Sequence, residues 1–319
     1  MKIIYDIFNY EEKINNAYVS IGNFDGVHRG HKALINSCID EARKNNGVSV
    51  VFTFYNHTKE TVGKGIVPKF INTLEEKIYS LELLGIDYLI LQPFTKEFSE
   101  LTGEEFIEKI ILNKLNTYEI FVGFDFHFGK NRCYNVKDLK DIGEKKHIKI
   151  REVSEIKIED KVVSSTAIRN HILNGDLTTV NHLLDSPLIL IGEVIHGRKI
   201  GRVMGFPTAN LERVNKAYLP YGIYGGACKI LGSDIEYDCV VNIGKNPTLK
   251  PNEKSVEVHI LNFDKDIYGK KLVVQLIKHL RKEIKFSGIE ELKKQIFLDI
   301  DNWKEYLETL KGSENGINS

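Results

Sequence analysis

Residues 16–55, NAYVSIGNFDGVHRGHKALINSCIDEARKNNGVSVVFTFY, decide the fold of the first half of the chain. The run from Asn16 to Gly22 is apolar enough to form a buried strand. After a glycine-rich bend, apolar residues return at the three-four spacing of an amphipathic helix: Leu34, Ile35, Cys38, Ile39 and Ala42. A second apolar run follows at 48–55. This order predicts a strand, a crossover helix and a parallel strand.

The alternation continues further along the chain. The pattern predicts helices at 73–85 and 102–115 and strands at 88–92 and 118–126. Both helices open with capping-box spacing, Thr73 with Glu76 and Thr102 with Glu105. We therefore expect an α/β doubly wound parallel sheet that binds its ligand at the carboxyl ends of the strands.

The second half has a different pattern. From Leu188 onward, short β-rich runs are separated by turn residues, at 188–195, 221–230, 236–244, 255–263 and 271–280. They predict an antiparallel β-barrel. Apolar residues from Ile289 to Leu310 recur at three and four, which predicts a C-terminal helix that covers one face of the barrel. Ser186 and Pro187 punctuate the change, so we expect domains at 1–185 and 186–319.

Composition limits the functions that fit. The chain has 319 residues, 44 basic and 44 acidic, so nothing favours a protein that coats nucleic acid or a membrane. Four cysteines without metal-type spacing fit reduced thiols in the cytoplasm. Acidic residues interrupt the N-terminus where a signal peptide would be apolar, and no run is long enough to span a membrane. We expect a cytoplasmic, globular protein.

The bend after the first strand is a candidate phosphate site. Gly22, Asn23 and Gly26 allow the backbone to approach a ligand, next to the amide groups of a helix start. His28 and His31 lie one turn apart and could donate hydrogen bonds to phosphate oxygens. A lone histidine here would more often be structural, and a metal site would need a third ligand such as Asp25 or Asp125. The glycine-flanked pair favours phosphate.

A second candidate lies in VSSTAIRNHILNGD. Ser164, Ser165 and Thr166 can cap a helix whose amide groups face an anion, and Arg169 can bind a phosphate through two hydrogen bonds. Taken alone, this stretch favours an ordinary capped helix with a surface arginine.

Several motifs in order resemble one enzyme family. GNFDGVHRGH, GFDFHFG and SSTAIR, followed by GRVMGFPTANL, NIGKNPT and VEVHILNFDKDIYGK, are similar to the bacterial bifunctional riboflavin kinase/FMN adenylyltransferase family. The resemblance implies a nucleotidyltransferase domain that converts FMN and ATP to FAD and pyrophosphate, followed by a kinase domain that makes FMN from riboflavin and ATP.

For the first domain, the resemblance implies that His28 and His31 hold the ATP phosphates and that Asp125 lies near the flavin phosphate or the nucleotide. Ser164, Ser165, Thr166 and Arg169 would bind the pyrophosphate side. Where the family usually has arginine, this chain has His127, and Cys133 and Tyr134 stand where a glycine is usual.

For the kinase domain, the resemblance implies that Thr208 and Asn210 hold the Mg²⁺ that accompanies ATP. Glu257 would be the general base. It alternates with Val256 and Val258, so it points to the opposite face of its strand. Spacing alone favours a solvent-facing glutamate, and only the resemblance favours the general base. Glycines and one arginine would form a loop that closes over ATP: Gly197, Gly201, Arg202 and Gly205.

Two other classes of function are compatible with parts of the sequence. The first half could be a different nucleotidyltransferase, or a tRNA-synthetase-like module with an oligonucleotide-binding barrel. The chain could also be a flavin-binding sensor without turnover. Incubation with riboflavin and MgATP distinguishes an enzyme from a sensor. The expected small-molecule partners are riboflavin, FMN and ATP.

Overall fold

The computed structural model describes residues 1–56, 68–158, 161–197, 201, 205–212, 216–245 and 254–315. The chain divides into two compact units, Met1–Ala167 and Ile168–Ser319. These units are defined by compactness alone. That the two activities divide at 185/186 stays a prediction. Across the described residues, no helix has the length and apolar character needed to cross a membrane.

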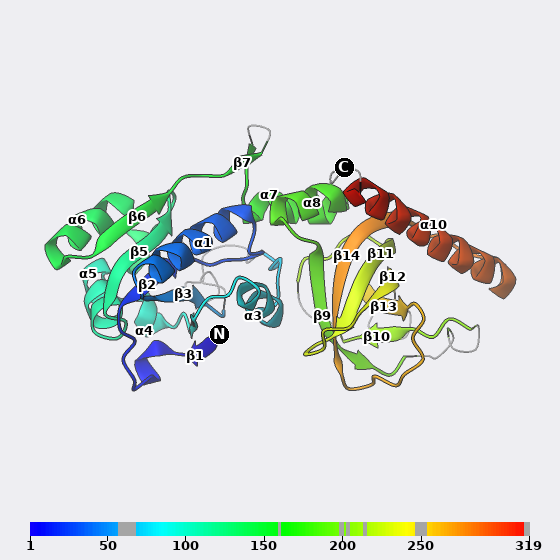
Figure 1. Ribbon diagram of the computed structural model, residues 1–319, viewed down its shortest axis with the longest axis horizontal. Helices are drawn as coiled ribbons and strands as arrows, with labels where there is room; N and C mark the ends of the chain where they lie inside the picture. Colours follow the sequence, from blue (N-terminus) through cyan, green and yellow to red (C-terminus); the bar gives the residue numbers. More distant parts are fainter. Residues whose placement is uncertain are drawn as a thin grey trace. The chain divides into compact units, whose positions relative to one another are not determined.

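The first unit is built on a six-stranded sheet in which all pairs are parallel (Figure 1). Its order is β1 (Lys2–Tyr5), β4 (Tyr88–Gln92), β3 (Val48–Phe54), β2 (Ala17–Ile21), β5 (Thr117–Gly123) and β6 (Lys149–Val153). From β2 the chain adds β3 and β4 on one side of that strand. It then returns to add β5 and β6 on the other side. The carboxyl ends of β2 and β5 therefore form the switch point at which such sheets bind ligands.

Helices cover both faces of this sheet, which confirms the doubly wound prediction. On one face, Leu34 of α1 (Arg29–Lys44) and Leu81 of α3 (Leu74–Glu82) pack with Val51. On the other, Leu139 of α6 (Val136–Lys146) packs in a core that contains Val50. Val50 and Val51 are adjacent, so the two-residue period of β3 supplies both cores.

The helix predicted at 102–115 begins as expected but does not continue as one regular helix. Thr102 and Glu105 form the predicted capping box at α5 (Gly103–Phe106). The next turn is a π-helix, η2 (Ile107–Leu112), and just after it Asn113 N donates to Glu108 O and Leu115 N to Ile110 O, both at 3.1 Å. Five apolar residues of this segment are buried: Phe106, Ile107, Ile110, Ile111 and Leu115.

The pattern missed several elements. Strand β6 reads KIREV and β1 has four residues, so neither edge strand has a long apolar period. The shorter elements are η1 (Ile7–Asn9), α4 (Lys96–Ser99), η3 (Lys130–Arg132), β7 (Lys157–Ile158) and β8 (Lys161–Val162).

The second unit contains a closed antiparallel barrel, as predicted. Its order is β10 (Ala209–Leu211), β13 (Lys254–Ile260), β12 (Glu236–Lys245), β11 (Gly222–Ile230), β14 (Lys271–Lys282) and β9 (Leu188–Ile195). Strand β10 was not predicted because three residues are too few to show alternation.

Helix α10 (Ile289–Asn315) packs on the outer face of the barrel through Trp303, which is fully buried. A Cβ at Gly225 would lie 2.2 Å from Cε3 of this indole, so β11 needs glycine where the ring rests. Arg281 binds Asp299 of α10 through two hydrogen bonds of 2.7 Å. The predicted apolar stripe packs only in its middle, because Ile289 is 61% and Leu310 38% exposed.

Two helices precede the barrel, α7 (Ser165–Asn174) and α8 (Leu177–Leu184). The side chain of Asn181 in α8 donates to Leu276 O of β14 at 2.9 Å and accepts from Leu188 N of β9 at 2.8 Å. Leu177, Val180 and Leu184 of the same helix are buried. Helix α8 therefore belongs structurally with the barrel.

Candidate active sites

The loop after β2 has an unusual backbone. Phe24 and Val27 have φ values of 47° and 42°, and Gly26 has 87°. Positive φ is rare for any residue with a Cβ, and for a β-branched residue such as Val27 it is an outlier that surrounding structure must hold in place. Strain of this kind concentrates at functional sites, and here it lies at the switch point of the sheet.

Contacts from other elements fix this loop. The carbonyl oxygen of Asn23 accepts from Lys77 Nζ at 2.9 Å and from Thr53 Oγ1 at 3.1 Å. Lys77 lies in α3 and also donates to Phe54 O at 3.0 Å. The carbonyl ends of β2 and β3 are thereby joined through one buried ammonium group.

Asp25 anchors the middle of the loop. Its Oδ1 accepts from the backbone amides of Ile71, at 2.9 Å, and Asn72, at 3.3 Å. Its backbone carbonyl accepts from Ser165 Oγ at 2.9 Å. A carboxylate oxygen that already accepts two amides is a poor metal ligand, and the described residues contain no group of three His, Cys, Asp or Glu that could hold a metal ion.

His28 and His31 meet at the start of α1. His28 is its N-cap, and the two rings stack with centroids 3.6 Å apart. His28 Nδ1 accepts from His31 N at 3.4 Å, which leaves Nε2 to carry the proton of the neutral ring. Among the described residues, His31 Nδ1 has no hydrogen-bond partner although it is buried.

Both imidazoles are neutral at pH 7. Burial lowers the pKa of His28 to about 4. Burial, with smaller contributions from His28 and Lys77, lowers the pKa of His31 well below its ordinary value. The pair therefore offers hydrogen-bond donors to an arriving anion rather than fixed positive charges.

The other predicted residues of the first half occupy varied positions. A Cβ at Gly22 would lie 3.0 Å from Cζ of Phe24, so the backbone is tightly packed there.

Ser164 Oγ accepts from Ala167 N at 3.2 Å and caps α7, whereas Thr166 is exposed. Ser165 differs from the prediction, because its hydroxyl bonds Asp25 O rather than a helix amide. Arg169 is half-buried in α7, within the second unit.

Asp125 follows β5 and is exposed. Because β5 pairs with β2 in parallel, Asp125 and the histidine loop lie at the same edge of the sheet. His127 Nδ1 lies 2.8 Å from Asp125 O, and the Tyr134 hydroxyl donates to Glu104, so these two unusual residues are used in local contacts.

In the barrel, three polar residues form a row across adjacent strands. Glu257 of β13 lies directly opposite Asn210 of β10 and Asn242 of β12. Val256 and Val258 are buried inside, so the row lies on the outer face. Asn242 was missed by sequence reasoning, although a polar residue between buried Val241 and Ile243 was a signal for it.

The predicted glycine loop lies next to this row. A Cβ at Gly197 would be 2.3 Å from Asn210 Nδ2, and one at Gly201 would be 2.3 Å from Phe206 O and 3.4 Å from Thr208 Oγ1. Gly205 has a φ of 88°. Arg202 lies outside the described residues. The described glycines thus bring the loop backbone against Thr208 and Asn210, where no larger residue would fit at Gly197.

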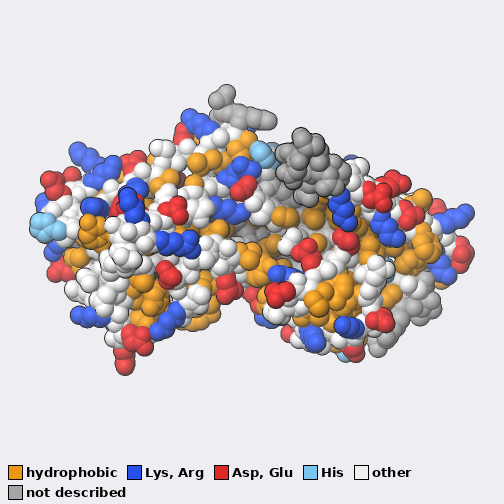
Figure 2. All heavy atoms as spheres, viewed as in Figure 1, with side chains coloured by type: hydrophobic (Ala, Val, Ile, Leu, Met, Phe, Trp, Pro, Cys, Tyr) orange, Lys and Arg blue, Asp and Glu red, His pale blue; other side chains and the backbone are white. Residues whose placement is uncertain are grey.

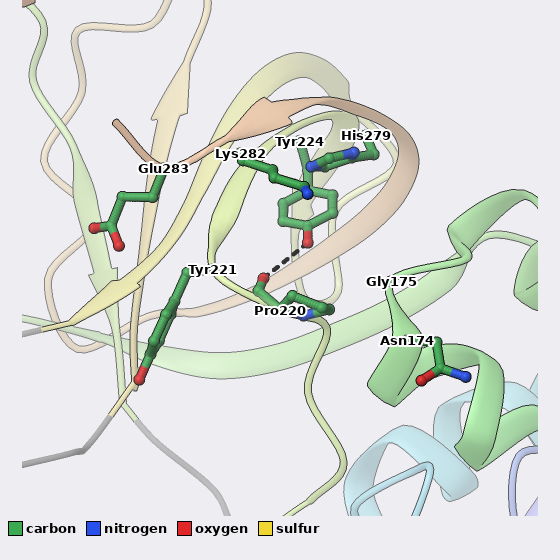
Figure 3. Close-up of a pocket in the computed structure, with 8 residues that line it drawn as sticks. All are labelled: Asn174, Gly175, Pro220, Tyr221, Tyr224, His279, Lys282 and Glu283. Atoms are coloured by element: carbon green, nitrogen blue, oxygen red, sulfur yellow. Dashed lines mark hydrogen bonds between the residues drawn. The ribbon is translucent and has the colours of Figure 1, made fainter. Parts of the chain in front are cut away.

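The second unit also contains a hollow of about 440 Å³ (Figure 3). Its lining includes Tyr221, Tyr224 and Glu283. A Cβ at Gly244 would lie 3.2 Å from Glu283 Oε1 and 3.3 Å from Asn242 Oδ1, so the hollow neighbours Asn242. Figure 3 shows the Tyr224 hydroxyl pointing at Pro220 O, 2.8 Å away. Burial raises the pKa of Tyr224 to about 12, which keeps this donor protonated.

Comparisons with known proteins show the family to which each part of the chain is similar. A family model described as FAD synthetase matches residues 10–167, and one described as riboflavin kinase matches 184–307. A protein of Buchnera aphidicola called bifunctional riboflavin kinase/FMN adenylyltransferase is 36% identical over 309 residues, covering 96% of this chain and 99% of the relative. The chain belongs to this family. It is an enzyme with both activities, and its FAD synthetase domain precedes its riboflavin kinase domain.

Other members of the bifunctional family match at similar length. The protein of Haemophilus influenzae is 32% identical, over 96% of this chain and 99% of the relative, and that of Bacillus subtilis is 34% identical, over 94% and 96%. A crystal structure described as a macrolide-efflux protein from Streptococcus pneumoniae superposes with a TM-score of 0.82 at 30% identity. The match covers 95% of this chain and 99% of that chain, so it supports the fold of both units.

Proposed function

We propose that the row Asn210–Glu257–Asn242 is the riboflavin kinase site and that the His28–His31 loop is the FMN adenylyltransferase site. We assign the first activity to residues 186–319 and the second to residues 1–185. The observation that carries the kinase assignment is the register of β10, β13 and β12, which puts the proposed base directly between two amide side chains.

In the kinase reaction, the Glu257 carboxylate accepts the proton of the riboflavin 5′-hydroxyl as that oxygen bonds the γ-phosphorus of ATP and ADP leaves. Thr208 and Asn210 supply hydroxyl and amide oxygens, the hard donors that Mg²⁺ prefers. The backbone at Gly197 and Gly201 approaches these two side chains, as a cradle for a metal-bound phosphate requires. Bound there, Mg²⁺ would neutralise phosphate charge.

We use the order of the strands to assign one side of Glu257 to each substrate. The glycine loop and Asn210 lie on the β10 side, which we assign to ATP. The hollow beyond Asn242 lies on the β12 side, which we assign to the riboflavin ring. Its aromatic and polar lining suits a planar heterocycle with polar edges.

Tyr221→Ala tests this placement. We expect the KM for riboflavin to rise about 3–10-fold, the cost of one aromatic contact, with the KM for ATP unchanged. Tyr237→Ala is the matched control, because Tyr237 lies at the end of β12 that is far from Asn242. Steady-state kinetics with each substrate varied in turn measures both constants. A rise in the KM for ATP alone would place the adenine ring in the hollow instead.

In the adenylyl transfer, a phosphate oxygen of FMN bonds the α-phosphorus of ATP and pyrophosphate leaves. This nucleophile needs little deprotonation, so catalysis rests on positioning and charge stabilisation. His28 and His31 donate hydrogen bonds to phosphate oxygens together with the amides at the start of α1. Ser164, Thr166 and Arg169 act on the pyrophosphate side, Ser165 positions the loop through Asp25 O, and Asp125 lies near the flavin phosphate or nucleotide.

The division into activities predicts that the kinase works alone. Residues 187–319 contain Thr208, Asn210 and Glu257, so this fragment should make FMN and no FAD. Residues 168–319 should do the same with a higher Tm, because Asn181 and the buried residues of α8 then cover β9 and β14. Calorimetry and product chromatography check both fragments. If 168–319 unfolds cooperatively yet makes no FMN, the kinase site is not self-contained.

Incubation of the full chain with riboflavin and MgATP tests the function as a whole. We expect FMN and then FAD, whereas a flavin sensor would return riboflavin unchanged. The cytoplasmic location and the absence of nucleic-acid and membrane partners stay predictions. On the face drawn in Figure 2, acidic and basic side chains of the described residues are interspersed, which supports the prediction about nucleic acid.

A further inference from the structure

We propose that Lys77 is a positioning residue for adenylyl transfer: it holds the strained loop that presents His28 and His31. This inference rests on the proposed role of that loop. Lys77 was not singled out by the sequence, since it reads as one lysine in an amphipathic helix.

The contacts of Lys77 place it behind the loop. Only 4% of the residue is exposed. Its Nζ donates to Asn23 O at 2.9 Å and to Phe54 O at 3.0 Å, at the carboxyl ends of the neighbouring strands β2 and β3. Asn23 directly precedes the segment with positive φ at Phe24, Gly26 and Val27. The ammonium group therefore fixes the point from which the strained backbone departs.

We infer that the positive charge of Lys77 holds the loop in position and does not add to the stability of the core. A buried ammonium loses its hydration, and an apolar side chain of similar size is often no less stabilising. Burial lowers the pKa of Lys77 to about 8, partly opposed by the carboxylate of Asp25. His31 also interacts with this charge, and Lys77 helps to lower the pKa of His31. Lys77 thus interacts electrostatically both with Asp25, which anchors the loop, and with His31.

Lys77→Met keeps the length of the stem and removes both hydrogen bonds. We expect adenylyl transfer in the full chain to fall about 100-fold, the usual effect of misplacing catalytic groups by about 1 Å. FMN formation should stay within about twofold. Lys77→Arg, which can still donate to two carbonyls, should recover most of the loss. Lys109→Met, an exposed lysine of the same unit paired with Glu105, is the matched control and should have no effect.

A pH profile separates positioning from simple stability. In the unsubstituted protein, adenylyl transfer should decline as pH rises through about 8, because the neutral amine bonds the two carbonyls less well. The profile of Lys77→Arg should stay flat there, since arginine remains charged. His28 and His31 do not titrate in this range.

Two further measurements keep the inference testable if Lys77→Met unfolds the first unit. Thermal unfolding reports that directly, and Thr53→Val removes the other donor to Asn23 O, so it should lower adenylyl transfer about 3–10-fold in a folded protein. Lys77→Met with normal adenylyl transfer, or Lys77→Arg with the same decline above pH 8, overturns the proposal. An unsubstituted chain that makes FMN but no FAD overturns the proposed function instead.

Discussion

Glu257→Gln is expected to lower riboflavin kinase turnover by about 10²–10⁴-fold, the usual effect of losing a general base. The amide keeps the shape and the position opposite Asn210 and Asn242 but cannot accept the proton of the 5′-hydroxyl. Added FMN should still be converted to FAD at the normal rate, because the histidine loop belongs to the other unit. Separate assays that start from riboflavin and from FMN measure the two effects.

Glu236→Gln serves as the matched control, since this glutamate is exposed at the far end of β12. It should leave both activities unchanged. Near-normal kinase turnover in Glu257→Gln would show that Glu257 is a surface residue of its strand, and the proposed kinase site would then be wrong.

The second large effect is expected from replacing both His28 and His31 with alanine. FAD formation should be abolished while FMN accumulates, because both proposed phosphate donors are removed and both belong to the first unit. His147→Asn, an exposed histidine at the end of α6, should change neither product.

Because the two rings are packed together, the double variant needs a folding control. Thermal unfolding and circular dichroism provide it, and His28→Gln, which keeps a donor on a similar stem, should retain part of the activity. Loss of FMN and FAD formation to the same extent in a folded protein would contradict separate sites. Unchanged FAD formation would remove the histidines from the mechanism.

Much of the fold was predictable because its signals are local. Buried parallel strands, capping boxes at Thr73 and Thr102, and alternation in the barrel strands all act over a few residues. That Glu257 points to the opposite face from Val256 and Val258 followed from the same alternation. The residues opposite Glu257 on the adjacent strands could not be predicted, because the order and register of strands depend on the whole barrel. Asn242 was therefore found only once β12 was paired with β13.

Other parts of the sites depend on contacts between distant segments. Ser165 lies in a motif typical of helix caps, yet its hydroxyl bonds Asp25 O, 140 positions earlier in the chain. The positive φ of Phe24 and Val27 violates the local preferences from which sequence reasoning works. Lys77 occupies an ordinary helical position, and only the arrangement of β2, β3 and α3 shows which carbonyl oxygens it binds.

The central claim, two independent sites in one chain, is tested most directly by mixing two variants that each lack one of the two activities. Glu257→Gln should make FMN from riboflavin only at its strongly reduced rate, and the His28→Ala, His31→Ala variant should stop at FMN. With riboflavin and MgATP, the mixture should form FAD, since FMN released by the second protein is a substrate for the first. A mixture that forms no more FAD than the two variants assayed separately would contradict the account.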